Sequence, residues 1–160
     1  MSIRISNGDR VPQVSLGRVV NGDVHHVDLH RLLADKRALI AGMAGAFTPV
    51  CSCQHVPDLL ANTSRMGLDL VICVTADNPW ALQAWANEVD PSNQILFLSD
   101  ANLTLARALG VNRLERELCL GETTARYAMF VDKGIVRRLN VESKITDLSC
   151  TRAQDVVFID

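Results

Sequence analysis

The sequence predicts a single α/β domain with a central β-sheet and helices on both faces. The chain has 160 residues, which is close to the length of one ordinary domain and short for two. Apolar runs of strand length alternate along it with helix-like segments, a pattern typical of α/β proteins. No repeat, linker or low-complexity tract interrupts the pattern. We therefore expect one domain over residues 1–160.

Short apolar runs bounded by turn residues mark the expected strands. They are Arg37–Met43, Leu68–Thr75, Ile95–Leu98, Tyr127–Val131 and Ile135–Val141. The turn Asp132-Lys133-Gly134 joins the last two into a hairpin. Another hairpin is expected in the opening stretch through Asp28, because Asn21-Gly22 is a favourable two-residue turn.

Helices are expected between and after these strands. They run from Cys51 to about Met66, from Pro79 to about Val89, from Leu103 to about Leu109, and within Thr151–Ile159. The second of these contains Trp80 and Trp85, and we expect at least one of the two rings in the core. The alternation of strands and helices, followed by a late hairpin, favours a mixed sheet with helices on both faces.

Composition and charge narrow the function classes. Hydrophobic residues make up 48% and charged residues 21% of the chain, as in globular proteins rather than disordered ones. The net charge of −2 and the 4% aromatic content argue against a nucleic-acid binder, which needs a basic face and stacking rings. The longest run that is both uncharged and mostly apolar, residues 38–47, is too short for a membrane span of ~18 residues, and the opening residues lack the apolar core of a secretory signal. We expect a soluble, cytoplasmic protein.

The five cysteines argue against a structural disulfide framework, because their number is odd and nothing indicates secretion. Redox or metal chemistry is then the open question. Cys73 lies inside an apolar run, so we expect it to act as a small buried hydrophobe. We expect the same of Cys119, although its polar surroundings also allow an exposed loop position.

The stretch from Ala44 to His55 carries the strongest chemical signal. It follows an expected buried strand and opens a helix, with Thr48 as a good N-cap and Pro49 in the first helical position. Cys51 is then the third helical residue, where its sulfur faces unpaired backbone N–H groups and the positive end of the helix dipole. Both features favour the thiolate, so we expect a lowered pKa for Cys51.

A low pKa alone does not make a fast thiol. At pH 7 a thiol of pKa ~6 is ~90% ionised, against ~3% for a thiol of pKa ~8.5, which is a gain of ~30-fold. The weaker intrinsic nucleophilicity of the more acidic thiol takes back ~13-fold, so the net gain is about twofold. A further donor must therefore stabilise the charge that develops in the transition state. Arg126, at the head of an expected strand, is the best candidate.

At this point the sequence resembles a known family. The run Gly45-Ala46-Phe47-Thr48-Pro49-Val50-Cys51-Ser52, with His55-Val56-Pro57, is similar to the active-site loop of the peroxiredoxins of the type-five (type II) subgroup. The resemblance continues in order along nearly the whole chain. It includes Gly8-Asp9, Val11-Pro12, Ile72-Cys73-Val74, Asp77-Asn78-Pro79, Leu98-Ser99-Asp100, Ala108-Leu109-Gly110, Arg126-Tyr127-Ala128-Met129 and Leu139-Asn140-Val141-Glu142. Several medium motifs in order are far more specific than one alone.

The resemblance implies a thioredoxin-like fold and thiol-dependent reduction of hydrogen peroxide and organic hydroperoxides, without a cofactor or a metal. Carried over by position, Cys51 is the peroxidatic cysteine, which peroxide oxidises to a sulfenic acid. The Thr48 hydroxyl binds the peroxide or the sulfur, and the Cys51 backbone N–H completes the donor set. Arg126 holds the thiolate and stabilises the developing charge with a fixed donor fork. These roles require Arg126 close to the sulfur, and the sulfur within reach of a small oxidant.

Two positions depart from the family pattern. In the motif P-x-x-x-T-x-x-C the first residue is proline, whereas this chain has Ala44. Proline would lock the loop and shield the thiolate, so we expect a less preorganised loop and easier overoxidation of Cys51. The second departure is Asp58, where the family usually has glycine.

The resemblance also bears on how the sulfenic acid is resolved. Cys53 shares a helix with Cys51, but residues two apart point to different faces, so a direct bridge would be strained. Cys150 lies in a segment like the one that carries the resolving cysteine in atypical two-cysteine members. This implies an intramolecular Cys51–Cys150 disulfide, reduced by a thioredoxin-like partner. The alternative is a one-cysteine enzyme recycled by glutathione or a glutaredoxin, or one that uses the thiol at Cys73. The family also implies a homodimer built against the active-site edge.

Other functions can be weighed against this hypothesis. A thioredoxin-type oxidoreductase needs Cys-x-x-Cys, and Gln54 stands where its second cysteine would be. A metal-binding module could use Cys51, Cys53 and His55, but this spacing is not a usual zinc spacing and no second ligand pair is evident. We expect His55 to be a supporting or packing residue instead. A peroxide sensor would use the same Cys51 chemistry, and the sequence leaves that alternative open.

Overall fold

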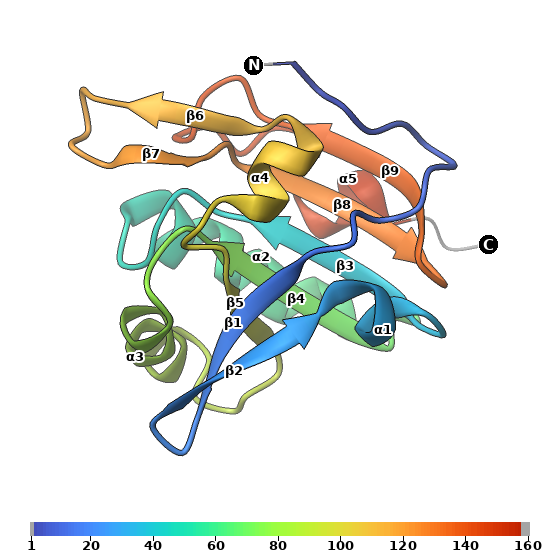
Figure 1. The fold of residues 1–160 in the computed structure, drawn as a ribbon, viewed down its shortest axis with the longest axis horizontal. Coiled ribbons are helices and arrows are strands. Elements are labelled where there is room, and N and C mark those ends of the chain that lie inside the picture. The colour runs from blue at the N-terminus through green and yellow to red at the C-terminus, as the bar shows by residue number, and fades with distance from the viewer. Residues whose placement is uncertain (1, 158–160) are drawn as a thin grey trace.

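The computed structural model describes residues 2–157 and confirms the expected α/β architecture. Its main sheet has seven strands in the order β2-β1-β5-β4-β3-β8-β9 (Figure 1). β3, β4 and β5 are parallel neighbours and the other pairs are antiparallel, so the sheet is mixed. A separate hairpin consists of β6 and β7. The strands are β1 (Ser15–Val20), β2 (Asp23–Asp28), β3 (Arg37–Gly42), β4 (Leu70–Thr75), β5 (Leu96–Ser99), β6 (Asn112–Glu115), β7 (Gly121–Thr124), β8 (Tyr127–Asp132) and β9 (Ile135–Val141).

The helices pack on both faces of the main sheet. They are α1 (Leu29–Leu33), η1 (Cys51–His55), α2 (Val56–Asn62), η2 (Thr63–Arg65), α3 (Pro79–Val89), α4 (Thr104–Leu109) and α5 (Ala153–Val156). α1 and α4 bury their apolar side chains in one core with Ile40 of β3, whereas α2, α3 and α5 share the other core with Leu39. Neighbouring strand residues thus serve opposite cores, as strand geometry requires. Within residues 2–157, no helix has the length and apolar character to cross a membrane.

The sheet register brings distant segments to one edge. β8 runs antiparallel to β3 with Tyr127 opposite Gly42, so Arg126 stands beside the point where β3 ends. β4 is parallel to β3 and ends at the same edge, which places the following Asp77 there too. A Cβ atom at Gly42 would lie 1.9 Å from the Tyr127 ring, so glycine permits this close packing. The edge therefore gathers the loop after β3, the loop after β4 and the start of β8.

Most of the expected elements are confirmed, with small shifts in their bounds. α3 and β9 have the expected bounds, and β4 begins two residues later than expected. The N-terminal hairpin turns at Asn21 and Gly22, whose φ angles of 51° and 84° suit the expected tight turn. Trp85 is fully buried, whereas Trp80 is 55% exposed, so one tryptophan is in the core as expected.

One helix and one hairpin were not expected from the sequence. α1 is only five residues long and begins after Asp28, whose carboxylate accepts a hydrogen bond from the Arg31 N–H. The β6–β7 hairpin has a polar sequence without an apolar run, so periodicity gave no signal for it. Cys119 lies exposed in the hairpin turn with a φ of 55°, so its expected burial was wrong. The C-terminal helix is confirmed at residues 153–156, and the last two residues of its expected range lie outside the described residues.

Candidate active site

Cys51 begins an irregular turn at the start of the predicted helix. The segment expected to run from Cys51 to about Met66 forms a π-type turn, η1, then α2 and a short 3₁₀ turn, η2. The Val56 N–H bonds to the Cys51 carbonyl, and Pro57 cannot donate a hydrogen bond at all. A single π-type turn of this kind widens the helix, and such turns often occur at functional sites. The Cys51 side chain is fully buried.

Thr48 occupies the expected position before the helix, but its side chain does not form the expected cap. Its carbonyl accepts the Ser52 N–H at 3.0 Å. Its hydroxyl donates instead to the Gly45 carbonyl at 2.6 Å, which leaves the Oγ1 lone pairs as acceptors. The tight turn between these residues places Phe47 at a φ of 62°, a left-handed conformation that costs energy for a non-glycine residue.

The Arg126 guanidinium contacts the Cys51 sulfur, as expected. Its Nη2 donates to Cys51 Sγ at 3.1 Å. Its Nη1 donates to His55 Nδ1 at 2.9 Å, while Nε and Nη2 both donate to the Ile145 carbonyl, at 3.0 and 2.7 Å. The arginine side chain is 1% exposed. The planar fork is therefore held by three partners at once, an arrangement that the ammonium group of a lysine cannot reproduce.

Of the two roles expected for His55, supporting or packing, its hydrogen bonds to Arg126 and Thr151 confirm the supporting one. Arginine only donates hydrogen bonds, so Nδ1 must accept from Arg126, and Nε2 donates to the Thr151 carbonyl at 3.0 Å. This assigns the neutral tautomer with its proton on Nε2. Burial, with the charge of Arg126 as the second cause, lowers the pKa of His55 to about 3. The sequence signal for the shared contact of Cys51 and His55 with Arg126 was their four-residue spacing, because this spacing puts both side chains on one helix face.

Glu142 holds the segment that contains Cys150. Its carboxylate accepts the backbone N–H groups of Ser149 and Cys150, at 2.7 and 2.8 Å, and the hydroxyl groups of Ser149 and Thr151, at 2.8 and 3.0 Å. Burial by itself raises the pKa of Glu142, but these hydrogen bonds outweigh it and lower the pKa to about 2. The carboxylate is therefore ionised and anchors the segment. Sequence reasoning did not assign this role to Glu142.

Cys150 is half-buried, and its thiol lies 3.7 Å from the Val141 carbonyl. Burial and then the Glu142 charge raise its pKa above the ordinary value. Asn140 Nδ2 donates to the Cys150 carbonyl at 2.8 Å and holds the same segment from β9. Each of the five cysteines, all within residues 2–157, is a free thiol. The structure therefore describes a reduced state in which Cys51 and Cys150 are not joined.

The loop before Cys51 is fastened at two points. The Ala46 N–H donates to Asp77 Oδ2 at 2.7 Å, so the loop after β4 anchors the loop after β3. The Ala44 carbonyl accepts the Thr123 hydroxyl of β7 at 2.8 Å. Ala44 thus has a tertiary tether where the family has a proline. The sequence did not identify Asp77 or Thr123 as part of the site, because their contacts cross between strands.

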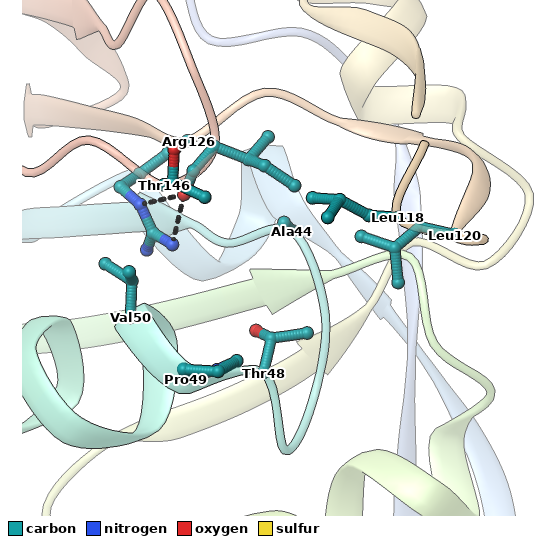
Figure 2. A pocket seen from close by; sticks show the side chains of 9 residues that line it. Ala44, Thr48, Pro49, Val50, Leu118, Leu120, Arg126 and Thr146 are labelled. Atoms are coloured by element: carbon teal, nitrogen blue, oxygen red, sulfur yellow. Dashed lines mark hydrogen bonds between the residues drawn. The ribbon is translucent and has the colours of Figure 1, made fainter. Parts of the chain in front are cut away.

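A cavity of about 260 Å³ lies beside Arg126 and the residues that precede Cys51. In Figure 2, Arg126 lies at one side of it and Leu118 and Leu120, from the β6–β7 connection, lie at another. Its lining is mostly apolar and consists of Ala44, Thr48, Pro49, Val50, Leu118, Leu120, Arg126, Ile145 and Thr146. Contrary to the expectation of an open sulfur, Cys51 has no exposed surface in this conformation. The cavity is lined by its neighbours Val50 and Arg126 and not by Cys51 itself, so peroxide can reach the sulfur only when lining residues move.

The candidate metal ligands do not gather around a common point. Cys53 is exposed, whereas Cys51 and His55 are buried and both contact Arg126. Among residues 2–157, no cluster of three or more histidine, cysteine or acidic side chains is arranged to hold a metal ion. The positive charge next to Cys51 and His55 comes from the arginine.

The protonation of His55 predicts how stability depends on pH. Its pKa is about 3 in the folded protein, against 6.5 ordinarily, so between these values the unfolded chain binds one more proton than the folded chain. The His55 contribution to the free energy of unfolding is complete above pH 6.5. As the pH falls below that value, it decreases by about 1.4 kcal/mol per pH unit. Urea unfolding of the wild type between pH 6.5 and 4.5 measures this slope.

The control for this prediction is a pair of histidine variants. The pH-dependent contribution of His55 to the free energy of unfolding should vanish in His55→Gln. It should persist in His26→Gln, because the His26 side chain is exposed on β2. The lowered pKa of Glu142 makes its contribution complete above pH 4.5 and lost only as the pH falls toward 2, so it lies outside this window. Equal slopes for the wild type and His55→Gln would contradict the prediction.

Comparison with known proteins identifies the family. The redoxin family model matches residues 6–156. Chloroplastic peroxiredoxin-2E of Arabidopsis thaliana is 32% identical over 145 residues, which cover 86% of this chain and 62% of that protein. Peroxiredoxin-2C of Oryza sativa subsp. japonica is 32% identical over 142 residues, which cover 86% and 88%. The crystal structure of reduced Prx3 from Vibrio vulnificus in complex with H2O2 is 28% identical, with a TM-score of 0.86 over 95% of this chain and 93% of that one.

The extent of these matches differs. This chain spans less than two thirds of the Arabidopsis relative but most of the rice and Vibrio proteins. The names of the plant relatives agree with the type-five (type II) subgroup, and the structural match confirms the thioredoxin-like fold. A family match from residue 6 to residue 156, together with a relative of nearly full coverage, shows that this chain belongs to the redoxin family, as one of its peroxiredoxin members.

Proposed function

We propose that this protein is a thiol peroxidase that reduces hydrogen peroxide and organic hydroperoxides at Cys51. The observation that carries the proposal is the 3.1 Å contact from Arg126 Nη2 to Cys51 Sγ, between two buried side chains. A fixed guanidinium beside the sulfur is already in place when charge develops on the reacting atoms. The names of the relatives support the proposal, as does the relative solved with hydrogen peroxide bound.

The first step is a displacement on the peroxide. The Cys51 thiolate attacks one peroxide oxygen, an S–O bond forms and the O–O bond breaks, which oxidises Cys51 to a sulfenic acid. The second oxygen leaves as hydroxide or alkoxide and takes up a proton to give water or an alcohol. The Thr48 Oγ1 lone pairs accept a hydrogen bond from the peroxide, because the hydroxyl proton is already donated to Gly45. The Cys51 backbone N–H is the remaining donor.

The cavity beside Arg126 is the route by which peroxide arrives. Its walls are mostly apolar, with Leu118 and Leu120 at the side of the β6–β7 hairpin (Figure 2). Apolar walls accept the carbon chain of an organic hydroperoxide, and the volume also admits hydrogen peroxide. Both substrate classes therefore fit the same cavity.

Cys150 resolves the sulfenic acid. A disulfide needs the two sulfur atoms about 2.0 Å apart, whereas Cys150 is a free thiol at the Val141 carbonyl, so its segment must first leave the Glu142 carboxylate. Its sulfur then attacks Cys51 Sγ, an S–S bond forms and the S–O bond breaks. Hydroxide leaves and takes the Cys150 proton as water. A thioredoxin-like dithiol reduces the disulfide and is itself oxidised. Cys73 is a poorer candidate, since burial raises the pKa of its thiol inside β4.

The protein also forms a homodimer against the active-site edge. Two large exposed apolar side chains support this. Phe47, which precedes the cavity-lining Thr48, is 56% exposed, and Leu118, which lines the cavity, is 50% exposed. Exposed apolar side chains that lie together often mark interfaces. The cytoplasmic location remains a prediction from the sequence.

Substitutions at Cys51 and Arg126 test the peroxidase proposal. Cys51→Ser removes the nucleophile and should abolish peroxide reduction. Arg126→Lys keeps the charge but loses the fork that joins the sulfur, His55 and Ile145, so the rate constant should fall on the order of 100-fold to 1000-fold. Stopped-flow measurement of peroxide consumption gives these rates. Arg137→Lys, exposed on β9, is the matched control. An Arg126→Lys rate equal to the wild type would contradict the proposed role.

Peroxide-treated protein reveals the resolving thiol. We expect mass spectrometry to detect a Cys51–Cys150 crosslink in the wild type and in the control Cys53→Ser, whose thiol is exposed beside Cys51. Cys150→Ser should lose the crosslink and turnover with thioredoxin. A glutathione adduct on Cys51 with Cys150 free would replace this scheme with the one-cysteine cycle. Repeated turnover with a thiol reductant supports an enzyme, whereas a single stoichiometric oxidation supports a sensor.

The homodimer predicts a concentration-dependent mass in solution. Sedimentation velocity should detect a dimer of the reduced wild type, and Leu118→Glu should shift the population to monomer because it puts a charge into an apolar interface. Leu114→Glu, on the same hairpin and 53% exposed, is the control for a charge outside the cavity rim. A wild type that stays monomeric at all concentrations used would refute the dimer.

A further inference from the structure

The structure assigns His55 a positioning role in which one neutral imidazole sets the Arg126 guanidinium against Cys51 and seats the segment that carries Cys150. This inference rests on the proposed function only where it concerns the resolving step. The evidence is the pair of hydrogen bonds that the two ring nitrogens make in opposite directions. His55 does not line the cavity, and its ring nitrogens bond to Arg126 and Thr151 rather than to the sulfur, so it acts through its neighbours.

On one side, His55 completes the set of acceptors around the guanidinium. The Ile145 carbonyl accepts from Nε and Nη2, and Cys51 Sγ accepts from Nη2. Nη1 has its contact with His55 Nδ1, at 2.9 Å. All these groups are buried, so losing this acceptor would leave an N–H of a cation without its partner. The arginine would then shift to find another, and a shift of about 1 Å at a catalytic group can slow a reaction about 100-fold.

On the other side, His55 seats the backbone next to Cys150. Its Nε2 donates to the Thr151 carbonyl at 3.0 Å, and the Thr151 hydroxyl donates to Glu142 at 3.0 Å. Glu142 also accepts the Cys150 N–H at 2.8 Å. A continuous set of hydrogen bonds therefore runs from the Cys51 sulfur through Arg126 and His55 to the Cys150 segment. Buried polar networks of this kind become rigid when every member is satisfied.

The position of His55 makes this network sensitive to the shape of η1. Cys51 is the first residue of that π-type turn and His55 is the last. An opening of the whole turn that exposes the Cys51 sulfur moves the imidazole with it and breaks the ring's contacts with both Arg126 and Thr151. The Cys150 segment then loses one of its tethers when the oxidised sulfur becomes accessible. The resting protein thus holds the two thiols apart until the turn opens.

Two substitutions separate the two functions of the ring. His55→Asn places an amide oxygen near the position of Nδ1 and keeps an acceptor for Arg126, but it loses the donor to Thr151. His55→Gln places an amide N–H near the position of Nε2 and keeps that donor, but it loses the acceptor. His26→Gln, exposed on β2, is the control for a histidine substitution elsewhere.

Two readouts should respond in a crossed pattern. The first is the rate of Cys51 alkylation by iodoacetamide as a function of pH, followed by mass spectrometry in a Cys53→Ser background. The second is amide hydrogen exchange of residues 149–151. In His55→Gln, alkylation at neutral pH should slow by about tenfold to 100-fold, with exchange like the wild type. In His55→Asn, exchange should speed up by about tenfold, with alkylation within about threefold of the wild type.

The outcomes separate this inference from the proposed function. Neither readout requires peroxide, so a wild type that does not consume peroxide but shows the crossed pattern would refute the peroxidase and support the role of His55. Identical effects of the two variants on both readouts, or no effect, would overturn the role. If the variants do not fold, ¹⁵N NMR of the wild-type imidazole decides. A proton on Nε2 throughout pH 5–8 supports the assignment, and a proton on Nδ1 overturns it.

Discussion

The contact between Arg126 and Cys51 is the interaction on which the rest of this structure depends. A guanidinium that is only 1% exposed has lost almost all its water, and a buried cation is costly unless other groups replace that water. The Cys51 sulfur, His55 Nδ1 and the Ile145 carbonyl replace it here. The groups that accept hydrogen bonds from the buried guanidinium also fix its positive charge next to the Cys51 sulfur. The stability of the fold and the proposed reactivity of Cys51 therefore depend on the same contacts.

The register of the main sheet brings Arg126 and Cys51 together. Arg126 and Cys51 are 75 residues apart in the chain. They meet because β8 pairs with β3 so that Tyr127 faces Gly42, while the loop after β3 leads directly into η1. The parallel partner β4 ends at the same edge and supplies Asp77, which anchors the loop. A slip of β8 by one residue would point the arginine to the other face of the sheet.

The surroundings of the site keep the Cys51 sulfur buried in this conformation. The loop before Cys51 includes Phe47 in a left-handed conformation, and a polar network connects the arginine to Glu142 and the Cys150 segment. Strain of this kind persists only where neighbouring contacts over-determine the backbone. A strained loop that is held by tertiary hydrogen bonds can keep the sulfur buried and can still move when those bonds break. This agrees with a Cys51 sulfur that has no exposed surface although a cavity lies beside Arg126.

The sequence by itself determined the elements with strong local signals. The apolar runs predicted β3, β4 and β9, the Asn21-Gly22 pair predicted the first hairpin, and Thr-Pro before Cys51 predicted a cysteine at a helix start. Arg126 could be named because a charge-stabilising donor was chemically required and the family motif places one there. The contacts of His55, Glu142, Asp77 and Thr123, the β6–β7 hairpin and the burial of the Cys51 sulfur were decided only by the tertiary structure. Local patterns report the conformation of neighbouring residues, whereas these features arise where strands distant in sequence meet and satisfy one another's buried polar groups.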